Sequence, residues 1–293
     1  MDDTRFHRQE LLFGKEGQEK IQSCRVAIVG LGGLGSHVAQ QLAYLGVRSF
    51  LLIDSDRASR SNLNRLIGAT EDDVAERLLK VDIANRLIRT IRSNAQVDFI
   101  TKSFISEEAF ARLQGTDFVF GCVDNDASRL VLNEFCQAYS RTYIDIATDI
   151  DPETKDFGGR MLLSDGRVCL SCKGEFSEAG LRYGFSTDQQ RREEEAVYGI
   201  RRGALGRAGP AVVSLNGILA SVAVTEFLVE LTGVRPAYLH LEYKGMMGIV
   251  ARDIDLPDFD CYYCKTLRGM GRAADVERYV RDGWGERFLG NRL

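Results

Sequence analysis

The stretch Val26-Ala-Ile-Val-Gly-Leu-Gly-Gly-Leu-Gly-Ser-His-Val-Ala-Gln40 constrains the fold of this chain more than any other. An apolar run, a cluster of glycines and a helical pattern predict a buried strand, a tight turn and a helix. The glycines allow a tight turn, close approach of a ligand to the backbone and close helix packing: Gly30, Gly32, Gly33 and Gly35. Because a helix N-terminus presents unpaired N–H groups, this stretch predicts a phosphate site.

An acidic residue ends the next apolar run. Asp54 lies about twenty residues after the turn, at the position where a carboxylate can accept hydrogen bonds from ribose hydroxyls. The glycine turn and this acid together predict a ribonucleotide site. They do not separate NAD from ATP.

The first half of the chain alternates predicted strands and helices. The patterns predict strands at 25–30, 49–54, 96–102, 118–123 and 142–147, and helices at 36–45, 75–93, 106–113 and 127–139. Such alternation is typical of an α/β fold with a doubly wound, mostly parallel, Rossmann-like sheet.

The second half has a different pattern. Strands are predicted at 158–164 and 239–253, the latter with the alternation of an antiparallel sheet, and a buried apolar helix at 211–231. The polar segment 173–209 between them is expected to be a solvated helix and loop, or a loop that crosses an active site. We therefore divide the chain into an N-terminal helical arm (1–24), a nucleotide-binding region (25–150), a region of antiparallel strands, crossover loop and cysteine pairs (151–268), and a C-terminal tail (269–293).

Polar side chains follow the predicted strands at one edge of the sheet. Asp56 and the segment Ser61-Asn-Leu-Asn-Arg65 come after the second strand, Lys80 lies on the next helix, and Asp124 follows the fourth strand. Because the carboxyl ends of parallel strands meet at one edge, we expect Asn62, Arg65, Lys80 and both acids around one mouth. Cations there would neutralise a triphosphate, and a carboxylate is a suitable ligand for Mg²⁺.

Four of the seven cysteines form two CxxC pairs. These are Cys169 with Cys172 and Cys261 with Cys264. Two such pairs predict a tetrahedral Zn²⁺ site that is structural, because four sulfur ligands leave no open position. The remaining three cysteines have apolar neighbours and are expected to be small core residues: Cys24, Cys122 and Cys136.

Composition argues against several classes of partner. The net charge is −4, and no basic run predicts binding to nucleic acid. The longest apolar stretch, 211–229, carries Ser, Asn, Thr and Glu, so no membrane span is expected. The charged N-terminus does not resemble a secretory signal, and the expected location is the cytoplasm.

The combination of motifs resembles the ThiF/MoeB/HesA superfamily, the adenylating enzymes related to ubiquitin-activating enzymes. The resemblance runs from about residue 5 to about residue 266. It is carried by Arg5-Phe-His-Arg-Gln9, the glycine turn, Leu51-Leu-Ile-Asp-Ser-Asp56, Ser61-Asn-Leu-Asn-Arg65, Lys80, Gly121-Cys-Val-Asp-Asn125 and both CxxC pairs.

The resemblance implies a role for each matching residue. Asp54 would bind the ribose, Asn62, Arg65 and Lys80 would hold the triphosphate of ATP, and Asp124 would serve the Mg²⁺. A C-terminal carboxylate of a ubiquitin-like or sulfur-carrier protein would attack the α-phosphate, giving an acyl adenylate and pyrophosphate. The carboxylate is already ionised, so catalysis would need positioning and charge neutralisation rather than a general base.

The resemblance also concerns partners. Arg8 would reach the ATP site of a neighbouring subunit, which implies a homodimer. Several members carry a cysteine in the crossover loop that bonds covalently to the carrier, whereas segment 173–209 has none. This favours adenylation alone, with the adenylate passed to another protein or nucleophile. A conjugating or sulfur-transfer enzyme could dock on segment 174–209 or on the tail.

Three other functions remain open at this point. The chain could adenylate a short peptide during natural-product maturation. A nicotinamide-dependent oxidoreductase would use the glycine turn and Asp54 but leave Asn62, Arg65, Asp124 and the cysteine pairs without a role. A non-catalytic subunit of a heterodimeric activating enzyme would have no need to keep Arg65, Lys80 and Asp124.

Overall fold

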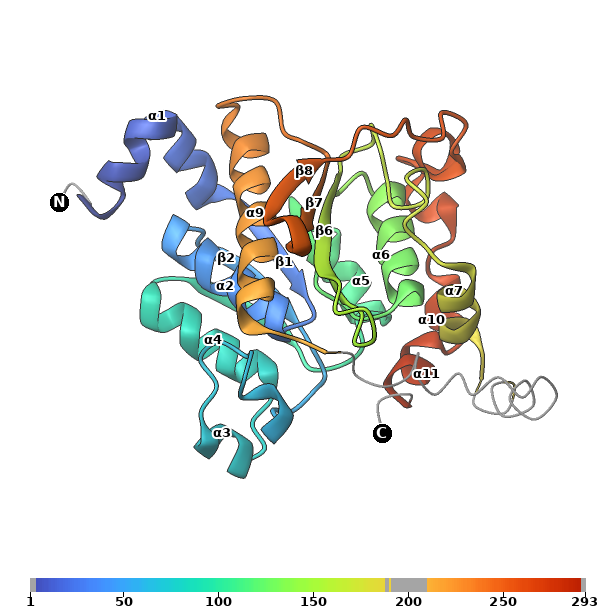
Figure 1. The fold of residues 1–293 in the computed structure, drawn as a ribbon, viewed down its shortest axis with the longest axis horizontal. Helices are drawn as coiled ribbons and strands as arrows, with labels where there is room; N and C mark the ends of the chain where they lie inside the picture. The colour runs from blue at the N-terminus through green and yellow to red at the C-terminus, as the bar shows by residue number, and fades with distance from the viewer. Residues whose placement is uncertain (1–3, 188–189, 191–209, 291–293) are drawn as a thin grey trace.

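A single mixed sheet organises the molecule (Figure 1). The computed structural model describes residues 4–187, 190 and 210–290. Within these residues, eight strands pair in the order β3-β2-β1-β4-β5-β6-β7-β8. Their bounds are β1 Arg25–Val29, β2 Ser49–Ile53, β3 Gln96–Ile100, β4 Phe118–Gly121, β5 Thr142–Ile150, β6 Phe157–Ser164, β7 His240–Lys244 and β8 Ile249–Arg252. The first five strands are parallel and the last three antiparallel, which confirms the predicted fold class.

The central strand β1 explains why its sequence is apolar without interruption. It pairs in parallel with β2 on one side and β4 on the other. Val26 and Ile28 face one hydrophobic cluster, and Ala27 and Val29 face the other. A strand buried on both faces needs apolar side chains at every position, rather than at alternate ones.

Helices cover both faces of the sheet (Figure 1). On one face, α2, α4 and α9 pack over the strands, and α1 packs against α9. On the other face lie α5, α6 and the C-terminal segment. The bounds are α1 His7–Ser23, α2 Gly33–Leu45, α4 Lys80–Ile91, α5 Glu107–Leu113, α6 Asp126–Ala138 and α9 Val213–Thr232.

Helix α9 is long and apolar enough to cross a membrane by length and composition alone. Half of this segment is buried inside the protein, where it contacts α1, α2, β5 and β6. Its apolar residues are therefore accounted for by the core, as was expected from its sequence.

The predicted helix 75–93 begins only at Lys80 in the structure, and a separate short helix precedes it. Helix α3 spans Glu71–Ala75, and α4 begins only at Lys80. Thr70 and Asp73 form a reciprocal capping box at the start of α3. Arg77, at φ +54°, lies in the left-handed region, which ends α3 and separates the helices. The apolar periodicity continued across this break, so it could not reveal the break.

The predicted strand 239–253 is a hairpin rather than one strand. Strands β7 and β8 pair antiparallel across a turn that contains Gly245 and Gly248. Gly248 has φ +66°, a conformation that glycine adopts readily. The hairpin extends the sheet at the edge opposite β3.

The crossover segment begins with helix α7, Glu178–Phe185. Its Phe185 packs against Tyr279 and Trp284 of the C-terminal segment, which contains α10 (Arg278–Arg281) and α11 (Trp284–Gly290). The tail in turn binds α6, because Arg278 pairs with buried Glu134 at 2.6 Å. Of the predicted crossover loop 173–209, residues 188–189 and 191–209 lie outside the described part of the chain.

Candidate active site

The strand order reverses between β1 and β4, and a pocket of about 330 Å³ lies at the carboxyl ends of these strands. Open α/β sheets bind ligands at such a point. The pocket contains nearly all the predicted nucleotide-binding residues: Gly30, Gly32, Gly33, Asp54, Asp56, Asn62, Arg65, Lys80 and Asp124. Gly35 lies one turn into α2, behind the lining, and Arg8 lies on α1 away from it.

The positions in the turn require glycine for different structural reasons. Gly30 has φ +90°, and an added Cβ would press on the carbonyl oxygen of Cys122. A Cβ on Gly35 would collide with the carbonyl oxygen of Gly30. At Gly32, by contrast, a Cβ would meet nothing within 4 Å. Gly30 and Gly35 therefore serve packing, whereas Gly32 leaves open space beside the start of α2.

That open space adjoins an uncapped helix. Helix α2 begins at Gly33, and its N-cap residue, Gly32, supplies no side-chain hydrogen bond. The first N–H groups of a helix have no partner within the helix. An anion in this part of the pocket would meet these donors together with the positive end of the helix dipole.

Asp54 is held rigidly at the wall of the pocket. Its Oδ2 accepts a hydrogen bond from the backbone N of Leu31 at 2.6 Å, and its Oδ1 accepts one from the backbone N of Asp56 at 2.8 Å. Burial raises the pKa of the Asp54 carboxyl, and nearby Lys80 opposes that rise. Each carboxylate oxygen has a second lone pair that can accept a hydroxyl hydrogen.

Lys80 and Asp56 form an ion pair in the pocket. The Lys80 Nζ lies 2.7 Å from Asp56 Oδ2, and both side chains are largely shielded from solvent. The backbone N of Lys80 also donates to the carbonyl oxygen of Asp56 at 2.9 Å, which fixes the start of α4 beside the end of β2. A bound polyphosphate would compete with Asp56 for the ammonium group.

The segment after β2 supplies Asn62 and Arg65. Asn62 Oδ1 accepts a hydrogen bond from the backbone N of Ser59 at 3.1 Å, as part of a short 3₁₀ turn. Arg65 donates through Nη1 to Ser61 O and to Asn64 Oδ1. Local hydrogen bonds therefore hold both side chains on the β2 side of the pocket.

Asp124 follows β4 and precedes α6. It is the exposed one of the three carboxylates that line the pocket, since Asp54 is buried and Asp56 is half-buried. The neighbouring Asn125 caps α6 by accepting a hydrogen bond from the backbone N of Ser128 at 2.8 Å. An exposed carboxylate at the mouth of a phosphate pocket suits a hydrated Mg²⁺.

Sequence reasoning missed several lining residues. Arg129 comes from the first turns of α6, Thr148 from the end of β5, and Asn216 from the first turn of α9. A polar residue in the apolar helix 211–231 was a usable signal for Asn216. Cys122 was predicted to be a core residue but is half-buried and lines the pocket, whereas Cys24 and Cys136 are buried as predicted.

The two CxxC pairs meet in space. The four Sγ atoms lie within 4.8 Å of one another, and Cys169 and Cys261 are 3.6 Å apart. Four sulfurs at about 2.3 Å from a tetrahedral Zn²⁺ would be about 3.8 Å apart, so this cluster fits the ion. Cys169, Cys172 and Cys261 are buried, and Cys264 is half-buried.

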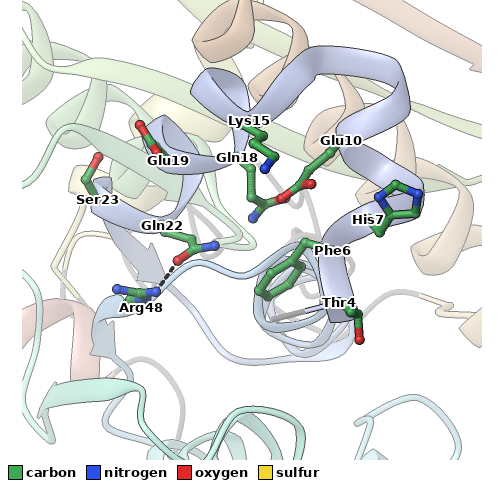
Figure 2. Close-up of a pocket in the computed structure, with 10 residues that line it drawn as sticks. All are labelled: Thr4, Phe6, His7, Glu10, Lys15, Gln18, Glu19, Gln22, Ser23 and Arg48. Atoms are coloured by element: carbon green, nitrogen blue, oxygen red, sulfur yellow. Dashed lines mark hydrogen bonds between the residues drawn. The ribbon is translucent and has the colours of Figure 1, made fainter. Parts of the chain in front are cut away.

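A second hollow, of about 580 Å³, lies under the N-terminal arm (Figure 2). The buried side chains of Phe6 and Gln18 line it and pack against Gly46, which ends α2. Gln9 and Gln18 also donate hydrogen bonds to Leu45 O at 3.0 Å. This hollow contains none of the predicted nucleotide-binding residues, and its floor anchors α1 to the core.

The curated proteins that resemble this chain include ones named as adenylyltransferases and one named as an activating enzyme. The sulfur carrier protein ThiS adenylyltransferase of Bacillus subtilis is 34% identical over 132 residues, 44% of this chain and 39% of that protein. The adenylyltransferase and sulfurtransferase MOCS3 of Drosophila ananassae is 30% identical over 175 residues, 59% and 36% of the two chains. The SAMP-activating enzyme E1 of Haloferax volcanii is 33% identical over 124 residues, 42% and 45%. The matched segments span less than half the length of these relatives.

Solved structures share the fold. MccB of E. coli superposes with a TM-score of 0.69 at 20% identity, covering 90% of this chain and 73% of that one. PaaA superposes with a TM-score of 0.60 at 22% identity, covering 85% and 81%. A profile of the ThiF family matches residues 6–260, which include the whole pocket and two of the four clustered cysteines, Cys169 and Cys172. The chain therefore belongs to the ThiF family.

Proposed function

We propose that this protein uses ATP to adenylate the C-terminal carboxylate of a ubiquitin-like or sulfur-carrier protein. The observation that carries the proposal is the pocket, in which Arg65, Lys80 and Asp124 surround the uncapped start of α2. Relatives named as adenylyltransferases and as an activating enzyme support it. A nicotinamide-dependent oxidoreductase would not need these three side chains for its reaction.

In this reaction a carboxylate oxygen bonds to the α-phosphorus while the bond to the β-phosphate oxygen breaks. Both reactants are anions, so the site must hold them together and neutralise their charge. Arg65 and Lys80 would bind the phosphates, and Asp54 would orient the ribose. Asp124 would hold Mg²⁺, which when bound neutralises charge on the phosphate oxygens.

The proposed product is the acyl adenylate itself. Segment 173–209 contains no cysteine. The thiol that lines the described pocket is that of Cys122, and burial raises its pKa well above the usual range, so it stays protonated at neutral pH. Without a thiolate nucleophile, the adenylate would pass to a downstream conjugating or sulfur-transfer enzyme.

ATP–pyrophosphate exchange tests this proposal. Purified protein with Mg²⁺ is assayed alone, with carrier proteins ending in Gly-Gly such as ThiS, and with short peptides. Exchange that requires a carrier with a free C-terminal carboxylate is the expected result. Exchange that responds only to short peptides would favour peptide maturation, and NADH binding without exchange would favour an oxidoreductase.

Arg8 is proposed to complete the ATP site of a second subunit. Its side chain is exposed on α1 and does not line the pocket of its own chain. We predict that Arg8→Ala and Asp124→Ala are each inactive in exchange, and that mixing them restores part of the activity. Restoration requires mixed dimers in which one site is intact. No recovery after subunits have demonstrably exchanged would contradict an Arg8 contribution from the partner.

A further inference from the structure

The pocket extends beyond the glycine turn toward β5 and the start of α9. Its lining there includes Val123, Arg129 and Thr148. Among the described lining residues, the cationic side chains are Arg65, Lys80 and Arg129. Arg65 and Lys80 come from segments after β2, whereas Arg129 comes from α6 on the opposite side of the switch point. The polyphosphate and a second anion could therefore meet different cations.

Arg129 is held firmly but keeps hydrogen-bonding capacity. Its side chain is 12% exposed, and its Nη2 donates to Val123 O at 2.9 Å. Its Nη1 lies 3.8 Å from Asp145 Oδ2, which is too long for a hydrogen bond. Its Nε is buried and has no hydrogen-bond partner among the described residues. A guanidinium that served only to pack the helix would be expected to satisfy these donors within the protein.

Asp145 attracts the Arg129 guanidinium without accepting a hydrogen bond from it. The fully buried carboxylate accepts hydrogen bonds from Tyr143 Oη at 2.7 Å and from Arg160 Nη1 at 2.6 Å. Burial acts to raise the pKa of Asp145, but Arg129 and Arg160 outweigh it, so the pKa is lowered and the group stays ionised. Two guanidinium groups thus share one carboxylate, and the one that borders the pocket is Arg129.

We propose that Arg129 is the positioning residue that receives the substrate's terminal carboxylate and holds it for attack on the α-phosphate of ATP. This inference rests on the adenylation function proposed above. A guanidinium fork matches the two oxygens of a carboxylate. One oxygen bonds to the α-phosphorus as pyrophosphate departs, and Arg129 keeps its protons throughout. Its charge reduces the repulsion between the two anions before they react.

The test compares Arg129→Ala and Arg129→Lys with Arg141→Ala. Arg141 is a matched control, because it also donates to backbone carbonyls, those of Tyr139 and Thr116, but lies at the amino end of β5. Exchange is measured with a carrier that is active with the wild type, ThiS being tried first. Loss of a charge-assisted contact should raise the carrier KM about 10- to 100-fold in Arg129→Ala, with the Kd for ATP unchanged within about twofold. Of these variants, only Arg129→Ala should regain activity when guanidinium chloride is added. The carrier KM of Arg129→Lys should lie between those of the wild type and Arg129→Ala.

A binding experiment separates recognition of the carboxylate from folding. With a non-hydrolysable ATP analogue present, the wild type and Arg141→Ala should bind the carrier more tightly than the same carrier with an amidated C-terminus. Arg129→Ala should not discriminate, and Arg129→Lys should discriminate less than the wild type. Full discrimination retained in Arg129→Ala, or an unchanged carrier KM in folded Arg129→Ala, would overturn the inference while the proposed function stands. A wild type that supports no exchange with any carrier would remove the proposed function and this inference with it.

Discussion

Asp124 is the residue on which the magnesium assignment depends. It is exposed at the mouth of the pocket, where its Oδ1 accepts a hydrogen bond from Asn125 Nδ2 at 3.2 Å, whereas Asp54 is buried and Asp56 pairs with Lys80. We predict that Asp124→Ala reduces Mg²⁺-dependent exchange by a factor of about 10² or more, because the metal loses its protein ligand. The melting temperature should be unchanged, since an exposed side chain contributes little to stability.

The matched control for that variant is Asp117→Ala. Asp117 is also exposed but precedes β4, at the amino end of the strand, where its Oδ2 accepts a hydrogen bond from the backbone N of Arg25. Exchange should be normal in this control. If Asp124→Ala retained exchange with an unshifted Mg²⁺ dependence, the magnesium assignment would be wrong.

At the residue scale, the sequence predicted what lies next to a recognisable strand end. Asp54, Asp56 and Asp124 follow apolar runs directly, so their edge of the sheet was predictable. Arg129 lies further along a helix, where its direction depends on how α6 packs on β5. Asn216 stands out as a polar residue in an apolar helix, but nothing local indicates that the start of this helix lies beside the pocket.

At the scale of elements, the glycines of the turn serve two purposes, close packing of the backbone and close approach of a ligand. We predict that Gly35→Ala lowers the free energy of unfolding by about 1–3 kcal/mol or more, because its Cβ would overlap the carbonyl oxygen of Gly30. Gly32→Ala should keep the stability of the wild type, because open space surrounds that position, but weaken ATP binding about tenfold or more. Denaturant unfolding and nucleotide titration measure the two effects.

Each glycine variant serves as the experimental control for the other. Equal loss of stability in both would mean that the turn is only a packing device. Unchanged ATP affinity in Gly32→Ala would mean that phosphate does not approach the backbone at that position.

Helix α3 provides a pH-dependent contribution to stability. Arg86 donates to both carboxylate oxygens of buried Asp73, and this hydrogen bonding lowers the Asp73 pKa to about 2 from 3.8. A depressed carboxyl pKa stabilises the folded state above pH ~4, and that stabilisation is lost as the pH falls toward 2. We predict that Asp73→Asn costs about 1–2 kcal/mol at pH 7, allowing for the half-exposed Arg86 side chain.

Urea unfolding of wild type and Asp73→Asn at pH 7 and near pH 2.5 checks this prediction. The difference in the free energy of unfolding should shrink at the lower pH. A difference that is the same at both values would exclude the ion pair as its cause. The sequence did not predict this pair, because α3, which carries Asp73, was not predicted as a helix.

At the scale of the whole molecule, the cysteine cluster joins distant parts of the chain. Cys169 and Cys172 follow β6, and Cys261 and Cys264 follow β8. We predict that a chelator strong enough to remove zinc lowers Tm by roughly 5–10 °C, because a zinc ion in this cluster would connect these two segments. Cys172→Ser should lack zinc, whereas Cys24→Ala should retain it. An unchanged Tm after zinc is shown to be gone would contradict a structural role.

The overall architecture was largely predictable, and the strand order was not. Alternating apolar runs and helices predicted the parallel part of the sheet, and two CxxC pairs predicted a cluster that the fold does assemble. Nothing local indicates that β4 lies beside β1, or that β7 and β8 continue the sheet beyond β6. Those neighbours depend on long-range packing of α9 and α6, which no single segment encodes.

The most direct test of the account is the identity of the nucleotide product. Wild-type protein, ATP and an active carrier are incubated with Mg²⁺. The products are then separated and identified by mass spectrometry. Attack on the α-phosphate predicts pyrophosphate and a carrier that has gained one AMP at its C-terminus. Formation of ADP and phosphate, with no AMP on the carrier, would contradict adenylation.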